Sequence, residues 1–174
     1  MIKIRLVLCY ILLTSFQESS EVGTFIKWSK ESKIKWEDFQ GKSIENTSLA
    51  AASVTGIMYS VFSASFERYV YEVNASFNKK YSWAWQEKSD AYGLAHEQGH
   101  FDIAEIYTRK FRKELSQNRY TYPQIEDQIF MLYNKYLDSL NLQQDTYDTE
   151  TLNSMNVEKQ KLWNEKIKTD LKSL

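Results

Sequence analysis

The hydrophobic pattern of the chain changes its period near the middle. Apolar or aromatic residues occupy every second position over residues 69–77, and a period of two predicts a half-buried strand. Residues 50–66 are rich in small and β-branched side chains and predict another strand, and residues 24–28 predict a short one. Residues 34–39 lead into a turn at residues 40–41. The first half of the chain is therefore predicted to be rich in β-structure.

The second half follows the period of an α-helix. A long helix is predicted over residues 89–116, a second one from residue 121 with Pro123 in its first turn, and a third over residues 156–171. The apolar positions of the long helix recur at intervals of three and four: Leu94, Phe101, Ala104, Tyr107, Phe111 and Leu115. The polar residues 143–154 predict a connection between the second and third helices.

These elements predict an α+β fold in one domain. A small antiparallel or mixed sheet from the N-terminal half packs against the long helix and two further helices. The chain is 43% hydrophobic and 26% charged, which is typical of a folded protein. It has no internal repeat, and its one proline and five glycines form no linker, so residues 21–174 are predicted to be a single domain.

The N-terminus has the layout of an export signal. Lys3 and Arg5 precede an apolar run over residues 6–16, which is too short to span a bilayer comfortably. A signal peptide is predicted over residues 1–20, and the protein is expected to be periplasmic, cell-envelope-associated or secreted. No clear cleavage point follows the apolar run, so an uncut signal anchor is the one route to a membrane that the sequence leaves open. A buried N-terminal strand is the alternative interpretation.

Charge and cysteine content exclude several classes of function. The 174 residues include 22 Lys and Arg and 23 Asp and Glu, and no basic cluster is present, so no nucleic-acid partner is expected. The one cysteine, Cys9, lies in the predicted signal peptide. The mature protein is therefore expected to have no disulfide and no zinc site that uses cysteine.

The long helix carries the one motif that points to chemistry, His96-Glu97-Gln98-Gly99-His100. Two histidines four residues apart project from one face of a helix and can bind one zinc ion. Glu97 follows the first histidine and can reach a water at the metal, where it acts as general base. This arrangement predicts a zinc-dependent hydrolase with a zincin-like fold. Gly93 and Gly99 are unfavourable within a helix, which suggests a close approach by another group.

A catalytic zinc site needs a third protein ligand, and the chain has no third histidine. Asp102 and Glu105 point away from the histidine face of the helix, and Glu105 is expected to pair with Arg109. Four carboxylates remain as candidates: Glu126 and Asp127 at the start of the second helix, and Asp148 and Glu150 in the polar connection. The first two also fit a role as charges that stabilise a helix N-terminus, and the last two fit helix capping.

Several segments together resemble a bacterial family of predicted secreted zinc-dependent proteases that is classified as a domain of unknown function. The resemblance rests on residues 34–41, 81–83, 96–105 and 147–151, followed by Gln160 and Trp163. In that family a histidine often stands two residues after the threonine of the tyrosine–aspartate motif, and this chain has Asn153 there. If that histidine is the third ligand, this chain has a weakened site. If Asp148 or Glu150 is the ligand, the change is peripheral.

Motif and resemblance together predict a zinc-dependent peptidase that acts on a peptide or protein substrate. His96 and His100 are the predicted ligands with Asp148 or Glu150, Glu97 is the general base, and Tyr147 is a candidate donor to the oxyanion. One alternative is a catalytically impaired zinc-binding or non-catalytic cell-envelope binding protein. Another is a metal-dependent amidase acting on cell-wall peptides. The five tryptophans are expected to pack in the core rather than to line a ligand groove.

Overall fold

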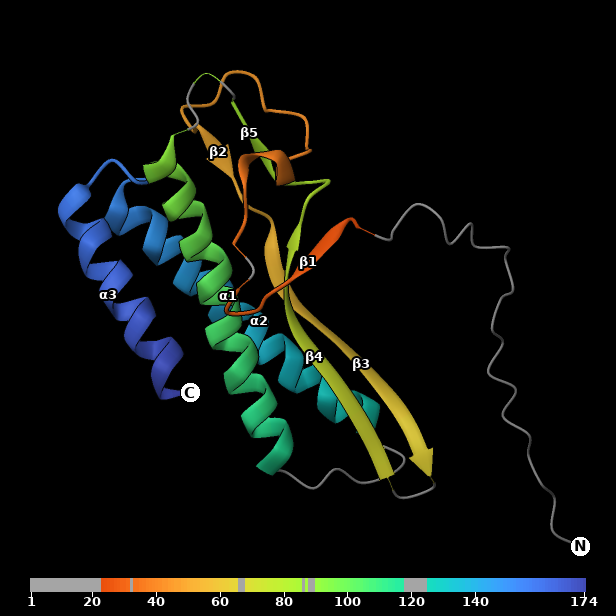
Figure 1. Ribbon diagram of the computed structural model, residues 1–174. Helices are drawn as coiled ribbons and strands as arrows, with labels where there is room; N and C mark the ends of the chain where they lie inside the picture. The colour runs from red at the N-terminus through yellow and green to blue at the C-terminus, as the bar shows by residue number, and fades with distance from the viewer. Residues whose placement is uncertain (1–22, 32, 66–67, 86, 88–89, 118–124) are drawn as a thin grey trace, which may run out of the picture.

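The computed structural model has the predicted α+β architecture (Figure 1). It describes residues 23–31, 33–65, 68–85, 87, 90–117 and 125–174. The predicted signal peptide and the predicted start of the second helix near Pro123 lie outside these residues. Among the described residues, no helix combines the length and the apolar character that crossing a membrane requires.

Two small antiparallel sheets come from the first half of the chain, as the alternating pattern predicts. The larger sheet has the strand order β1–β4–β3, and β2 pairs with β5 in a separate two-stranded sheet. The strands are β1 (Phe25–Lys27), β2 (Ala51–Ala52), β3 (Thr55–Ser65), β4 (Arg68–Asn78) and β5 (Trp83–Ala84). The predicted period of two holds over residues 72–75 of β4, where Val73 and Ala75 are the buried positions. Residues 75–78 at the end of the strand are all buried.

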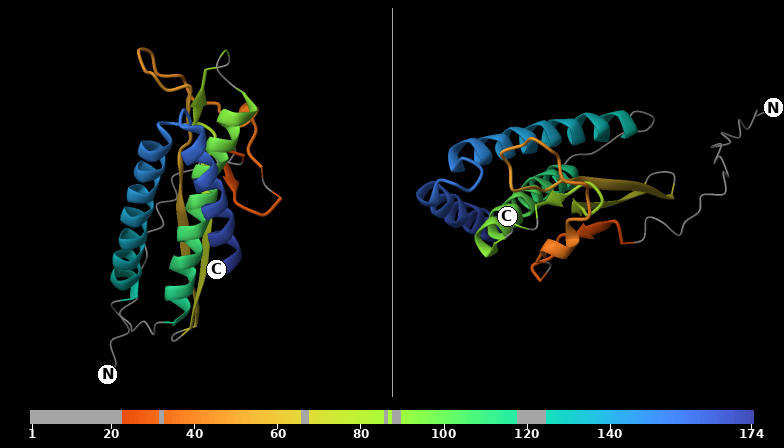
Figure 2. Two further views of the ribbon diagram at one scale, coloured as in Figure 1. Left: turned by 90° about the vertical axis from the view of Figure 1, so that its left-hand side faces the viewer. Right: turned by 90° about the horizontal axis from the view of Figure 1, so that it is seen from above.

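Three helices follow: α1 (Ala91–Gln117), α2 (Ile125–Thr151) and α3 (Val157–Ser173). The long helix α1 runs alongside the β3–β4 hairpin and also contacts α2 and α3 (Figures 1 and 2). Its central position explains its many buried residues. Glu105 is among them, and its carboxylate pairs with Arg109 as predicted, at 2.8 Å, and also with Arg112, at 3.0 Å.

One prediction of local structure needs correction. The polar residues 143–154 were expected to form a connection, but α2 continues to Thr151. Leu140, Tyr147 and Thr151 are buried at intervals of seven and four, so this segment keeps an apolar stripe that its polar residues conceal. Within residues 34–39, Trp36–Asp38 form a 3-10 helix, because the backbone N–H of Lys35 donates to the side chain of Asp38 and starts a turn.

Helix α1 packs closely against Tyr147 of α2 at Gly99. A methyl group added at this position would lie 2.9 Å from Cζ of Tyr147 and still closer to its hydroxyl oxygen. Tyr147 is fully buried and has little room to move. The glycine at position 99 suggested that another group lies close to the helix there, and that group is the side chain of Tyr147 from α2.

We expect the Gly99→Ala variant to lower the free energy of unfolding by about 1–3 kcal/mol, because the added methyl group overpacks the α1–α2 contact. Urea denaturation followed by circular dichroism measures the change. Gly56→Ala is the matched control, since a methyl group there meets no atom within 4 Å, and its effect should stay within about 1 kcal/mol. Equal stabilities for the two variants would contradict the close contact.

Candidate metal centre

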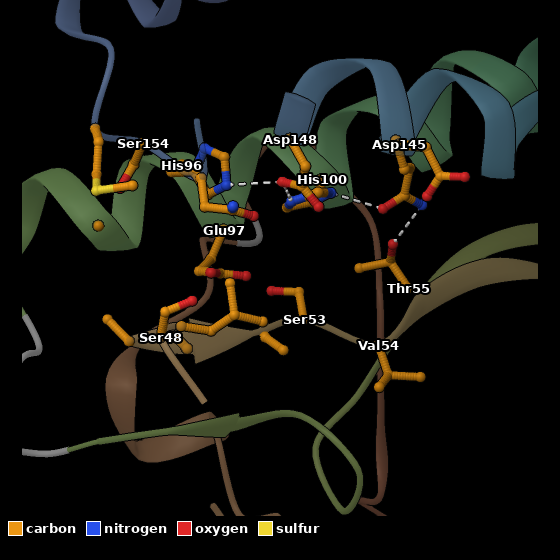
Figure 3. Close-up of a pocket in the computed structure, with 18 of the residues that line it drawn as sticks. Ser48, Ser53, Val54, Thr55, His96, Glu97, His100, Asp145, Asp148 and Ser154 are labelled. Atoms are coloured by element: carbon orange, nitrogen blue, oxygen red, sulfur yellow. Dashed lines mark hydrogen bonds and ion pairs between the residues drawn. The ribbon is translucent and has the colours of Figure 1, made fainter. Parts of the chain in front are cut away.

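The two histidines lie one turn apart on α1, and both are buried, with exposures of 4% and 6%. Their rings face each other edge-on, with centroids 5.0 Å apart. The helix fixes this arrangement, because side chains four residues apart project from the same face. His96 and His100 therefore present their Nε2 atoms to a common point (Figure 3).

Asp148 of α2 completes the cluster at that point. Its Oδ1 lies 3.1 Å from Nε2 of His96 and 2.9 Å from Nε2 of His100. The ligand atoms of these three residues all lie within 4.8 Å of one another. Two imidazoles and one carboxylate are a group that could hold a metal ion, and catalytic zinc sites use three protein ligands of these kinds. We refer to His96, His100 and Asp148 as the ligand triad.

The other candidate third ligands lie elsewhere. Oε2 of Glu150 accepts a hydrogen bond of 2.9 Å from the indole N–H of Trp163, and Glu150 is not part of the triad. Glu126 and Asp127 are exposed in the first turn of α2, about six turns of helix before Asp148. The structure thus brings Asp148 to the histidines and keeps the other three carboxylates away from them.

Each histidine is held from behind by a glutamine amide. Nδ1 of His96 lies 2.8 Å from Oε1 of Gln160, and Nδ1 of His100 lies 2.7 Å from Oε1 of Gln144. Gln160 comes from α3 and Gln144 from α2, one turn before Asp148. Gln160 was named only as part of the family resemblance, and neither residue was predicted to belong to the site. Gln144 and Asp148 are four residues apart, so they lie on the same face of a helix. A prediction of helix for this segment would therefore have placed Gln144 beside Asp148.

The orientation of the two amides sets the hydrogen positions on the histidine rings. Nε2 of Gln160 donates to the hydroxyl of Tyr147 at 2.6 Å and to Asn164 at 2.8 Å, and Nε2 of Gln144 donates to Thr55 at 3.0 Å. Both amide oxygens must then accept from the imidazole Nδ1–H groups. With Nδ1 protonated, Nε2 of each ring donates to the Asp148 carboxylate when the imidazole is charged and presents a lone pair to it when the imidazole is neutral. In the neutral form, the two Nε2 atoms and the Asp148 carboxylate are three acceptors that face one point, and a cation bound at this point would stabilise them.

The electrostatics of the centre favour positive charge at the same point. Burial lowers the pKa of His100, but its hydrogen bond to Asp148 and the negative charges of Asp148 and Glu97 outweigh this effect and raise the pKa overall. Burial raises the pKa of Asp148, and the hydrogen bonds to His100 and His96 reverse this effect and hold the pKa well below its usual range. Asp148 is therefore an anion at neutral pH, as a metal ligand must be.

Glu97 is buried beside the triad, and its Oε2 has no hydrogen-bond partner among the described residues. Figure 3 shows its carboxylate between the histidines and Ser53. A buried carboxylate oxygen without a partner is unfavourable, and proteins keep such groups mainly where a ligand or a reacting group will meet them. A cation at the triad and a water beside it would satisfy this oxygen.

Tyr147 supports the histidines from behind. Its ring stacks on His96 with centroids 4.6 Å apart, and its hydroxyl donates to the backbone oxygen of His96 at 3.2 Å. Burial raises the pKa of this hydroxyl, and the hydrogen bond from Gln160 only partly opposes the shift. Tyr147 does not line the cavity in front of the triad. Its placement therefore supports a packing role and gives no support to the predicted role as oxyanion donor.

A cavity of about 720 Å³ opens in front of the triad. Glu97, all three members of the triad, and Ala51 and Ala52 of β2 line it, and Ser53 lies across the cavity from the histidines (Figure 3). Asn153 lies at the edge of this cavity, in a turn where three successive residues have positive φ. The three groups of the triad come together without a contribution from position 153.

The amide of Gln144 offers a test of the support behind the triad. We expect Gln144→Leu to weaken zinc binding by about 10–100-fold, because the Nδ1–H of His100 loses its acceptor. Gln144→Glu keeps an acceptor at this position and should retain most of the affinity. Competition with a chromogenic chelator measures both.

The neighbouring residue provides the control for this experiment. Oε1 of Gln143 accepts from Tyr107 and does not contact the triad, so Gln143→Leu should leave zinc affinity unchanged. A Gln144→Leu protein that binds zinc as tightly as the parent would contradict the proposed orientation of His100.

Comparison with known proteins places the site within a family without assigning it a function. A family model described as "Bacterial protein of unknown function (DUF922)" matches residues 68–154. This range includes Glu97 and the complete ligand triad. No curated protein and no solved structure matches the chain.

Proposed function

The chain belongs to the DUF922 family of bacterial proteins of unknown function, and we propose that it is a zinc-dependent hydrolase acting on peptide bonds. One observation carries this proposal. Two imidazoles and a carboxylate converge beside a buried glutamate whose Oε2 has no hydrogen-bond partner among the described residues. Two histidines four residues apart, a glutamate directly after the first of them and a later carboxylate, Asp148, would give the proposed enzyme a zincin-like site.

The ligand triad fits zinc by its chemistry. Imidazole nitrogen and carboxylate oxygen are zinc ligands, and a catalytic site takes three protein ligands and leaves one position open. The carboxylates of Asp148 and Glu97 also balance the charge of a divalent cation in a buried site. His96 and His100 would bind through Nε2, because their Nδ1–H groups are already donated to glutamine amides.

Zinc at the triad supplies a Lewis acid that polarises a carbonyl group and lowers the pKa of water to about 7. Glu97 takes the proton from the water whose oxygen attacks the carbonyl carbon. When the C–N bond breaks, Glu97 passes this proton to the leaving amine. The buried position of Glu97 keeps bulk water away from this transfer.

The β2 side of the cavity supports a peptide as substrate. Among the strands of the described residues, β2 pairs with β5 alone, and the residues of β2 line the cavity. An unpaired strand edge can form backbone hydrogen bonds with an extended peptide. Ala51 and Ala52 both line the cavity, and their small side chains occupy little of it. The predicted export signal makes a cell-envelope or secreted location part of the same proposal.

Metal removal tests the proposal directly. Zinc-loaded protein should cleave an unfolded protein such as casein, treatment with 1,10-phenanthroline should abolish cleavage, and added zinc should restore it. Cleavage of cell-wall peptides instead of casein would identify the alternative amidase. A protein that binds zinc at one equivalent and cleaves neither substrate would support the non-catalytic alternative. Cleavage that survives metal removal would refute the proposed mechanism.

A further inference from the structure

A second cavity, of about 590 Å³, lies on another face of α1 from the one that carries the triad. Its wall on α1 includes Ala95, Gln98 and Asp102, whereas His96, Glu97 and His100 line the first cavity. Its other walls come from the segment after β1 and from α3. We call it the α3 cavity. Its size is that of sites for small ligands.

The charged residues of the α3 cavity are nearly all positive. Five basic side chains line it: Lys30, Lys33, Arg109, Lys168 and Lys172. Asp102 is its one acidic lining residue, and Oδ1 of Asp102 already accepts hydrogen bonds from Trp28 and Gln98.

Acidic side chains neutralise the positive charge of these five residues only in part. Lys168 lies 3.7 Å from Glu165, and both side chains are exposed, so solvent screens this pair. Arg109 is paired with Glu105, which it shares with Arg112. The cavity therefore attracts anions.

The floor of the α3 cavity is apolar and held in place. The indole N–H of Trp28 donates to Asp102 at 2.7 Å, and the guanidinium of Arg109 lies over the Trp28 ring at 5.1 Å from its centroid. Ile167 and Leu171 of α3 provide further apolar surface. Because these contacts fix the indole before any ligand arrives, little ordering is required on binding.

A hydrogen-bond donor also lines the cavity. Oδ1 of Asn164 accepts from Gln160 at 2.8 Å, so the Nδ2 group is the part of this amide that remains to donate. An apolar floor, a polar donor and a rim of lysines are the features of a site for a molecule with an apolar body and an anionic head.

We propose that the α3 cavity binds a small amphipathic anion, one that carries a carboxylate or phosphate group on an aliphatic or aromatic body. The anionic group lies among the lysines, and the body lies against Trp28, Ile167 and Leu171. This site is separate from the ligand triad and does not depend on the proposed hydrolase activity.

Calorimetric titration of the full-length protein with octyl phosphate and with octanoate, both below their micelle concentrations, tests the proposal. At least one of the two should bind with one-to-one stoichiometry, and the stronger one identifies the preferred head group. Neutral octyl glucoside should bind at least about ten-fold more weakly, since a hydrogen bond to a charged group contributes about 1.5–3 kcal/mol.

Charge-reversal variants locate the binding. Lys168→Glu and Lys172→Glu should each weaken binding of the anion by about ten-fold or more. Lys161→Glu makes the same change on the same helix, at a residue outside the cavity, and should have little effect. The proposal is overturned if neither anion binds, if octyl glucoside binds as tightly, or if all three variants behave alike. If the metal-free and zinc-loaded proteins bind the anion with equal affinity, the α3 cavity binds it independently of the triad.

Discussion

Replacement of Glu97 by glutamine is expected to abolish hydrolysis while the protein keeps its zinc. Glutamine is nearly the same size as glutamate but cannot accept a proton at neutral pH, so the attacking water loses its base. Loss of a general base lowers a rate by about 10²–10⁴-fold. Zinc should stay bound because Glu97 is not one of the three ligand residues. Elemental analysis and the rate of casein cleavage, measured on the same preparation, test both parts.

Folding is not expected to obscure this result. Since Oε2 of Glu97 has no hydrogen-bond partner among the described residues, the substitution removes no hydrogen bond from that atom. Glu114→Gln is the matched control: it makes the same change on α1 at a residue that does not line the triad cavity, and it should leave the rate unchanged. A Glu97→Gln enzyme with the activity of the parent would rule out Glu97 as the base.

Replacement of Asp148 by alanine is expected to remove both zinc and activity. Asp148 contributes the one anionic group of the triad, and its Oδ1 contacts the Nε2 atoms of both histidines. Loss of an outer-shell partner lowers metal affinity by about 10–100-fold, and loss of a direct ligand should exceed that range. Chelator competition measures the affinity, and casein cleavage measures the activity.

Two carboxylates on the same helix serve as controls for the Asp148 variant. Asp145 lines the same cavity, three residues earlier on α2, but is not part of the triad. Glu150 pairs with Trp163. Asp145→Ala and Glu150→Ala should both keep zinc at one equivalent. If Glu150→Ala loses zinc and Asp148→Ala keeps it, the assignment of the third ligand is wrong.

Much of the fold follows from local patterns in the sequence. The alternation over residues 69–77 predicts β4, and the intervals of three and four over residues 89–116 predict α1, because each pattern reflects a single buried face. The prediction was wrong over the last turns of α2. There the side chains of Gln144 and Asp148 are polar because they contact His100, and they conceal the helical period.

This error explains why the sequence alone did not decide between Asp148 and Glu150 as the candidate third ligand. In a loop, Asp148 and Glu150 are equivalent candidates. In a helix, residues two apart differ in direction by about 200°, so only one of them can face the histidines. Tertiary contacts over long separations in sequence were also beyond local patterns. The amide of Gln160 reaches His96 across 64 positions, and Trp28 reaches Asp102 across 74.

A crystal structure of the zinc-soaked protein, with anomalous data collected at the zinc absorption edge, tests the metal centre most directly. We expect one strong peak about 2 Å from Nε2 of His96, from Nε2 of His100 and from a carboxylate oxygen of Asp148. A structure without a peak at that point, or with zinc bound by other residues, would contradict the assignment of this site as a metal centre.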